Sequence, residues 1–154
     1  MRIRCLHILA ASALTLTVTA FGQEKKVDRS KLPPAVEKTI QAQSQGATVK
    51  GISTERENGK LQYEVEMTVN GHSKDLAVAT DGTLLEIEEE VTFDSLPSGA
   101  KDALTAKAAG ARITKVESLT KKGKLVAYEA ATLKGDKKGE IQVGPNGETL
   151  KHEE

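Results

Sequence analysis

Aromatic residues are almost absent from this chain of 154 residues, which has no tryptophan, two tyrosines and two phenylalanines. Large aromatic side chains supply much of the buried area of small cores and dominate binding energy at many interfaces. We therefore expect cores of aliphatic side chains and binding surfaces with few aromatic anchors. Basic and acidic residues number 22 each. A chain without excess positive charge has no footprint for nucleic acid or anionic lipid.

Cysteine and histidine are also scarce. The only cysteine is Cys5, and His72 and His152 are the only histidines beyond the first 22 residues. Nucleophilic catalysis needs a reactive side chain activated by a neighbouring base, and these scattered residues offer no such set. The chain also has no glycine-rich phosphate loop and no metal-finger spacing. We expect no catalytic residues, no cofactor and no enzymatic activity.

Residues 1–22 have the three parts of a secretory signal. Arg2 and Arg4 are basic, an apolar stretch runs to Val18, and small residues precede an expected cleavage after Gly22. The alternative is a membrane anchor, but the stretch is shorter than the roughly 20 apolar residues that span a bilayer. We expect a periplasmic or secreted protein that is not inserted in the membrane after cleavage.

Cleavage would leave 132 residues with 20 basic groups, 22 acidic groups and no cysteine, so no disulfide could form. Residues 23–31 are polar apart from Val27 and have little to bury. We expect this segment to be a tether.

The rest of the chain repeats itself, which divides it into a first copy at 32–92 and a second at 93–154. At a fixed offset of about 64 residues the pairs are Leu32/Leu96, Pro33/Pro97, Ala42/Ala106, Gly46/Gly110, Ala47/Ala111, Gly59/Gly123, Lys60/Lys124 and Leu61/Leu125. After one extra residue in the second copy, the match resumes at Tyr63/Tyr128, Glu64/Glu129, Val78/Val143, Gly82/Gly147, Leu85/Leu150, Glu88/Glu153 and Glu89/Glu154. A repeat of this length suggests two duplicated small domains.

Each copy predicts one helix followed by four strands. Proline opens the helix, apolar residues follow at every fourth position, and Gly46 or Gly110 ends it. Apolar and polar residues then alternate along 61–69. Turns are expected at Asn58-Gly59, Asn70-Gly71, Asp81-Gly82, Lys122-Gly123, Gly135-Asp136 and Asn146-Gly147. The extra residue near Val126 or Ala127 suggests a β-bulge.

These patterns predict an α+β fold of two tandem repeats, each with one helix packed on a four-stranded antiparallel sheet in meander order. A unit of about 60 residues is only marginally stable by itself. We therefore expect the two copies to pack together or to share a continuous sheet.

The ordered motifs resemble those of the tandem PepSY-like proteins, a group that includes β-lactamase-inhibitor-like proteins. The matching residues are Leu32, Pro33, Gly46, Gly59, Lys60, Leu61, Tyr63, Glu64, Asp81 and Gly82, and Leu96, Pro97, Gly110, Gly123, Lys124, Leu125, Tyr128, Glu129, Asn146 and Gly147. They cover about 120 residues. The resemblance implies an exported bacterial protein that acts by binding and that inhibits or moderates a secreted or cell-envelope hydrolase. The chain departs from that group in having few aromatic residues for a clamp on an enzyme.

Two sets of residues are candidates for function. Glu86, Glu88 and Glu90 alternate with apolar residues and share one strand face. They could attract a divalent ion, although a solvated strand face is the favoured interpretation because no loop supplies the further oxygens that Ca²⁺ needs. Tyr63 and Tyr128 occupy matching places and are expected in the core rather than at a contact surface.

The expected function is binding to another periplasmic or secreted protein, with the binding residues unassigned. Two alternatives stay open: a periplasmic protein that binds a ligand or divalent ion on the acidic strand face, and an accessory of folding or stability with no fixed partner.

Overall fold

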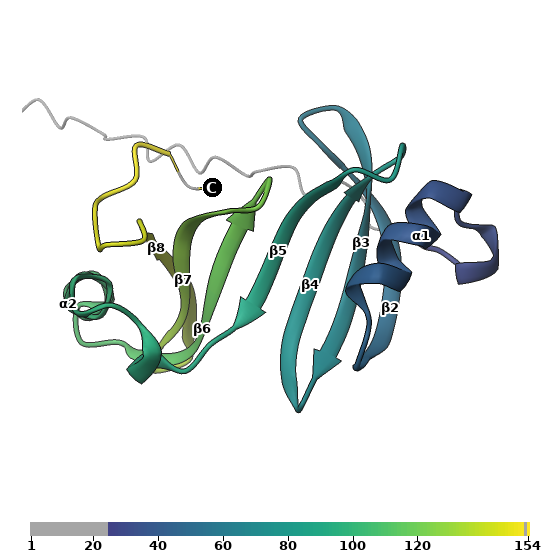
Figure 1. Ribbon diagram of the computed structural model, residues 1–154. Coiled ribbons are helices and arrows are strands. Elements are labelled where there is room, and N and C mark those ends of the chain that lie inside the picture. Colours follow the sequence, from purple (N-terminus) through teal and green to yellow (C-terminus); the bar gives the residue numbers. More distant parts are fainter. Residues whose placement is uncertain (1–24, 153) are drawn as a thin grey trace, which may run out of the picture.

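The computed structural model describes residues 25–152 and 154. Eight strands form one antiparallel sheet in which the strands follow one another in chain order (Figure 1). They are β1 (Lys25–Lys26), β2 (Ala47–Glu57), β3 (Lys60–Val69), β4 (His72–Ala79), β5 (Leu84–Glu90), β6 (Arg112–Lys121), β7 (Lys124–Lys134) and β8 (Lys137–Val143). The helices are the short 3-10 turns η1 (Arg29–Lys31) and η2 (Phe93–Ser95) and the α-helices α1 (Pro34–Gln43) and α2 (Ser98–Ala108).

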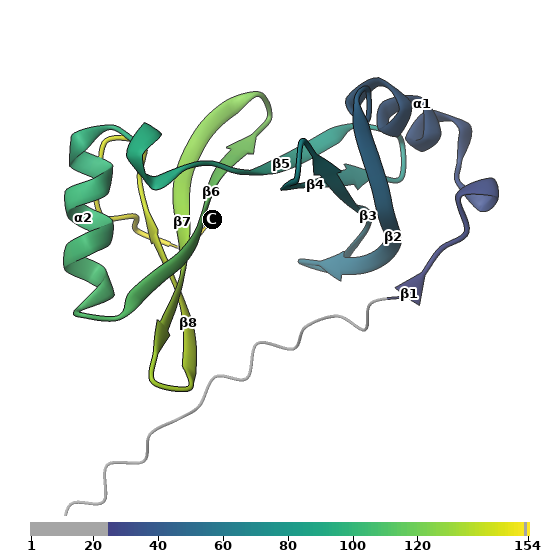
Figure 2. The same cartoon turned by 90° about the horizontal axis from the view of Figure 1, so that it is seen from below.

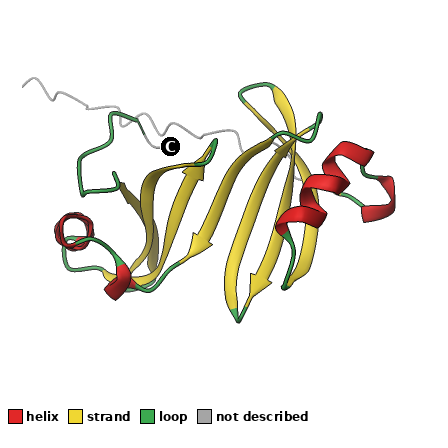
Figure 3. Cartoon of the chain, viewed as in Figure 1, coloured by secondary structure: helices red, strands yellow, loops and turns green. Residues whose placement is uncertain are grey.

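The two α-helices lie at opposite ends of the sheet (Figure 3). Each begins next to a proline, with Pro33 and Pro97 at the N-cap positions. Proline suits the first turn because the amide hydrogen it lacks would have no partner inside the helix. After α2, Ala109 and Gly110 both have positive φ angles of 48° and 80°, which turn the chain into β6.

Each helix covers its own apolar core (Figure 2). The first core consists of buried residues from α1 and the strands β2 to β4, namely Val36, Ile40, Ile52, Val65, Met67, Leu76 and Val78. The second core joins α2 to β6, β7 and β8 through Leu96, Ala100, Leu104, Val116, Ala130 and Val143. Both cores are free of tryptophan and phenylalanine among these buried members, as the composition predicts. Tyr63 and Tyr128 pack at the margins of the first and second core, which confirms their expected place.

Both helices lie on the same face of the sheet. Ile87 of β5 packs against the first core and lies opposite Thr120 of β6. Thr120 shares a strand face with Val116 of the second core, since side chains alternate along a strand. The other face of the sheet, which we call the polar face, therefore carries the alternate residues of all the strands.

The predicted fold class is wrong. The strands form one eight-stranded sheet, in which β5 of the first copy pairs directly with β6 of the second. Such pairing satisfies edge hydrogen-bonding groups that two separate sheets would leave open. The second copy also contributes three strands rather than four, because residues 148–150 form none. The position in the second copy that corresponds to Ile87 of β5 is His152, which lacks an apolar side chain to pack into the core.

The expected tether is part of the folded unit over its described residues. Lys25 and Lys26 pair with β2, and the amide of Val27 donates to the carbonyl of Ile52 at 2.8 Å. Val27 also packs against the first core. A single apolar side chain and a free sheet edge are thus enough to dock this polar segment. The expected signal at 1–22 lies outside the described residues.

The local predictions are confirmed. Two-residue turns join the strands at Asn58-Gly59, Asn70-Gly71, Lys122-Gly123 and Gly135-Asp136, and neighbouring strands within each copy pair antiparallel. Asp81-Gly82 lies within the four-residue loop between β4 and β5, whereas the turn at Asn146-Gly147 follows β8 and joins no described strands. The bulge is also present, since Leu119 faces Ala127 while the next residue of β6, Thr120, faces Leu125. Val126 is therefore the extra residue. Among the described residues, no helix is long and apolar enough to cross a membrane.

Candidate functional site: an acidic row on the polar face

Carboxylates from five neighbouring strands form a continuous row across the polar face. Directly opposite residues of paired strands share a face. Asp75 lies between Glu66 and Glu88 in this way, and Glu117 lies between Glu90 and Glu129. Like charges in directly opposite positions destabilise a sheet. We call these residues the acidic row: Glu66, Asp75, Glu88, Glu90, Glu117 and Glu129.

Three members of the row form a compact cluster at the centre of the sheet. Asp75, Glu88 and Glu117 each offer a carboxylate oxygen, and these oxygens all lie within 4.8 Å of one another. They come from β4, β5 and β6, so the cluster spans the junction between the two copies. Glu117 is buried, with 7% of its surface exposed, and the other two are half-buried. Water can therefore screen this negative charge only in part.

Glu117 is held by two polar partners, one from β4 and one from its own strand, β6. The Ser73 hydroxyl donates to Glu117 Oε1 at 3.0 Å. Lys115 Nζ lies 2.7 Å from Glu117 Oε2. Burial acts to lower the pKa of Lys115, but the hydrogen bond and charge of Glu117 raise it. One lysine therefore compensates one carboxylate of the cluster and leaves Asp75 and Glu88 without an ion pair among the described residues.

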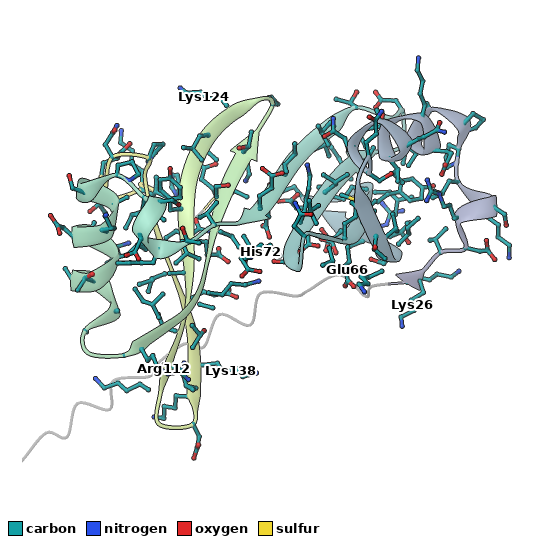
Figure 4. The ribbon with its side chains drawn as sticks, turned by 60° about the horizontal axis from the view of Figure 1, so that its bottom comes forward. Lys26, Glu66, His72, Arg112, Lys124 and Lys138 are labelled. Atoms are coloured by element: carbon teal, nitrogen blue, oxygen red, sulfur yellow. The ribbon has the colours of Figure 1, made fainter. Side chains whose placement is uncertain are left out.

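The two carboxylates that lie directly opposite Glu117, Glu90 and Glu129, have different environments. Glu90 accepts a hydrogen bond from the Ser73 amide at 3.0 Å and lies 3.2 Å from His72 Nδ1. These contacts, the backbone one first, lower the pKa of Glu90. Glu129 accepts a bond from Gln142 Nε2 at 2.5 Å, yet burial raises its pKa. Figure 4 shows Glu66 of β3 and His72 of β4 on the half of the sheet that carries α1.

The central carboxyl groups bind protons more tightly than usual. Burial raises the pKa of Glu88 to about 8, helped by its hydrogen bond with Glu86 and by the charges of Glu86, Glu129 and Glu117. Burial, followed by the charge of Glu117, also raises the pKa of Asp75. Asp75 and Glu88 should therefore release protons when a positive charge is placed near the cluster.

The three glutamates of β5 that the sequence singles out have different partners on the neighbouring strands. Glu88 joins Asp75 and Glu117 in the cluster. Glu86 lies 3.3 Å from Lys121 Nζ on β6, and Glu90 contacts His72 and Ser73. The acidic face of β5 is therefore shared among three different sets of partners.

Hydroxyl and imidazole groups meet at one point on this face, at the start of β4. The Ser73 hydroxyl bonds the carboxylates of Glu117 and Glu90, at 3.0 and 3.4 Å. His72 Nδ1 also contacts Glu90, so the serine and the histidine both face the same carboxylate rather than each other. This arrangement holds carboxylates in place and activates no nucleophile.

Comparisons with known proteins give a likeness in fold. The sequence matches no protein-family model, and no curated protein matches it. A Bacteroides eggerthii protein described as periplasmic has a similar structure, with a TM-score of 0.63 and 18% identity over 78% of this chain and 86% of that one. A DUF2874 family protein from Bacteroides uniformis is similar with a TM-score of 0.59 and 16% identity over 75% and 84% of the two chains.

A BLIP-like protein from Bacteroides fragilis shares the fold as well. Its TM-score is 0.56, with 20% identity over 80% of this chain and 86% of that chain. At these identities the likeness concerns the fold alone. The expected resemblance to inhibitor-like proteins thus holds at the level of architecture.

Sequence reasoning found Glu88 but missed Asp75 and Glu117. Asp75 could have been found, because the two-residue turn at Asn70-Gly71 fixes the β3–β4 register and places it opposite Glu66. No such signal exists for Glu117, since a helix and two loops separate β5 from β6.

Proposed function

We propose that this chain is an exported, non-enzymatic binding protein whose acidic row binds a cationic region of a partner protein outside the cytoplasm. The observation that carries the proposal is the row itself, in which carboxylates from five strands lie opposite one another and are only partly compensated. The likeness in fold to a BLIP-like protein supports a binding role for the sheet.

The negative charge of the acidic row determines which side chains a partner must present. Lysine or arginine side chains placed over the row would replace like-charge repulsion with attraction, and arginine can bind a carboxylate with two parallel hydrogen bonds. Because the pKa of Glu88 is raised to about 8, binding at neutral pH would also expel a proton. Affinity should therefore rise from pH 6 to pH 8 and fall with added salt.

The partner class that we propose is a secreted or cell-envelope hydrolase that the protein restrains. The scarcity of aromatic residues argues against a clamp built on aromatic anchors. Contacts through charge and backbone would instead favour fast association and selection by complementary charge. A basic rim beside a hydrolase active site would fit this chemistry.

Affinity capture from a periplasmic extract tests the proposal. The wild-type protein is compared with a row variant, Glu88→Gln with Glu129→Gln. A matched control, Glu57→Gln with Asp136→Asn, neutralises one exposed residue at the end of β2 and one in the β7–β8 turn. We expect the wild type and the control to retain the same protein, identified by mass spectrometry and slowed in an activity assay. Equal retention by the row variant would contradict the proposal.

Divalent-ion binding is a second candidate, favoured by the approach of three carboxylates within 4.8 Å. Ca²⁺ takes six to eight oxygen ligands, of which Asp75, Glu88 and Glu117 could supply part and water the remainder. A bound cation would also stabilise the charged form of Glu88.

Calorimetry with CaCl₂ or MgCl₂ at pH 7 distinguishes this candidate. Ion binding should release protons, so the measured heat should depend on the ionisation enthalpy of the buffer. Asp75→Asn should abolish both the heat of ion binding and its dependence on the buffer, whereas Glu57→Gln should change neither. Absence of heat and of any thermal shift at millimolar ion would rule this candidate out.

A further inference from the structure

The last strand of the sheet has an open edge along half of its length. Among residues 25–152, β8 has a single strand neighbour, β7. Its second half is covered, because Gln142 and Val143 are buried and Lys107 Nζ from α2 donates to the Gln142 carbonyl at 2.7 Å. Residues 137–140 are exposed, and the end of the β7–β8 hairpin projects beyond the neighbouring strands (Figure 2).

The C-terminal segment does not close this edge. In the sequence comparison, residues 149–154 correspond to β5, the strand that covers β4 in the first copy. The described part of the segment forms no strand on β8. Instead, the Glu154 amide donates to Gln142 Oε1 at 2.8 Å, and its carboxylate lies 3.6 Å from Lys121 Nζ. The last residue is thus held over the polar face, and the edge remains available.

The surface beside this edge is partly apolar. A hollow of about 610 Å³ borders β8 and includes Ala131 and Leu133 of β7 together with Lys138 and Glu140. Figure 4 shows Lys138 at the free end of the hairpin, at the opposite end of β7 from Lys124. An exposed strand edge is a template for pairing with another strand. The charges on this edge, Lys137, Lys138 and Glu140, oppose pairing in any register that does not place opposite charges together.

We propose that residues 137–141 pair antiparallel with the same residues of a second copy, about a two-fold axis through Gly139. Lys138 and Glu140 both lie on the polar face, opposite Leu133 and Ala131 of β7. The axis at Gly139 places Lys138 of each copy opposite Glu140 of the other and so forms two cross-strand ion pairs. The sheet of each copy continues into the other, as a two-fold interface requires.

Other registers that keep the polar faces on one side are unfavourable. Moving the axis to residue 138 would place Lys138 opposite itself, and moving it to residue 140 would place Glu140 opposite itself. Pairing also ends before Gln142, whose carbonyl is already occupied by Lys107. Two strands of about five residues bury much less than the roughly 1,000 Å² of a stable interface, so the dimer should be weak.

A charge-exchange series measured by sedimentation velocity tests the pairing. With protein expressed from the full chain, we expect the wild type to form dimers reversibly as its concentration rises toward the millimolar range. Lys138→Glu and Glu140→Lys should each weaken dimerisation about tenfold, because both ion pairs become like-charge pairs. The variant with both changes should recover wild-type association, and Lys124→Glu should leave it unchanged. A monomer at every concentration, or no recovery in the double variant, would overturn the proposal.

Cross-linking tests the register directly. In a Cys5→Ser background, a mixture of Lys138→Cys and Glu140→Cys proteins should form a disulfide-linked dimer in higher yield than either variant alone, with circular dichroism confirming that both are folded. Preferential linking of Lys137→Cys to Glu140→Cys would mean that the second copy is flipped, against the proposal. Dimerisation only after removal of residues 149–154 would mean that the chain covers its own edge, and it would also overturn the proposal. None of these outcomes depends on what the acidic row binds.

Discussion

Replacing Glu88 with glutamine should make the protein more stable at neutral and alkaline pH. Burial and the neighbouring carboxylates raise the pKa of Glu88 from 4.5 to about 8. The folded state therefore holds a proton that the unfolded state releases between these two values. Stability falls with rising pH wherever the folded state binds more protons. The contribution of Glu88 is thus favourable below pH 4.5 and is lost progressively up to about pH 8.

The size of this loss follows from the same interval. The rise in the pKa of Glu88 from 4.5 to about 8 corresponds to a loss of at most about 5 kcal/mol in the free energy of unfolding. Glu88 is only half-buried, so screening by water reduces the expected value to about 1 to 2 kcal/mol. Glutamine keeps the shape and a hydrogen-bonding group but carries no charge. The free energy of unfolding of Glu88→Gln should equal that of wild type near pH 5 and exceed it by about 1 to 2 kcal/mol at pH 8.5.

Urea unfolding at pH 5, 6, 7 and 8.5, in buffer with a chelator, measures this difference. The chelator removes any divalent ion that would compensate the cluster. Glu57→Gln is the matched control, since Glu57 lies exposed at the end of β2, and its difference from wild type should not change with pH. A difference between Glu88→Gln and wild type that is constant across this range, or that reverses in sign, would refute the reasoning.

Three further substitutions test the packing, the turns and the surface, each by urea unfolding at pH 7. Leu104→Ala should cost about 2 to 5 kcal/mol, because this side chain is fully buried in the second core. Gly82→Ala should cost more than about 1 kcal/mol, since Gly82 has a φ of +86° and an added Cβ would lie 2.6 Å from the Ala35 carbonyl oxygen. Arg29→Ala should cost less than about 1 kcal/mol, because its 2.8 Å ion pair with Glu37 is exposed; a loss above 2 kcal/mol would contradict that view.

Local signals in the sequence predicted local structure well. Proline and the four-residue apolar spacing fix α1 and α2, because both act within one or two turns. Turns such as Asn70-Gly71 fix the register of the strands they join, since a two-residue loop leaves no freedom for slippage. The same logic places Asp75 beside Glu66 from the sequence alone.

Pairing across the junction of the two copies could not be predicted in this way. Between the end of β5 and the start of β6 lie η2, α2 and their loops, and no turn rule sets a register over that distance. The position of Glu117 opposite Glu90 follows only from β5–β6 pairing. The same gap explains why the sequence did not decide between two sheets packed together and one continuous sheet, and why Glu117 could not be assigned to the cluster.

The two faces of the sheet impose opposite demands on this protein. The face under α1 and α2 buries two aliphatic cores and supplies the stability of the fold. The polar face holds carboxylates directly opposite one another, an arrangement that lowers stability at neutral pH. Departures from favourable local patterns are expected chiefly at functional sites. If the acidic row is such a site, the substitution of Glu88 that raises stability should also weaken retention of the partner, whereas a row with no function would lose nothing.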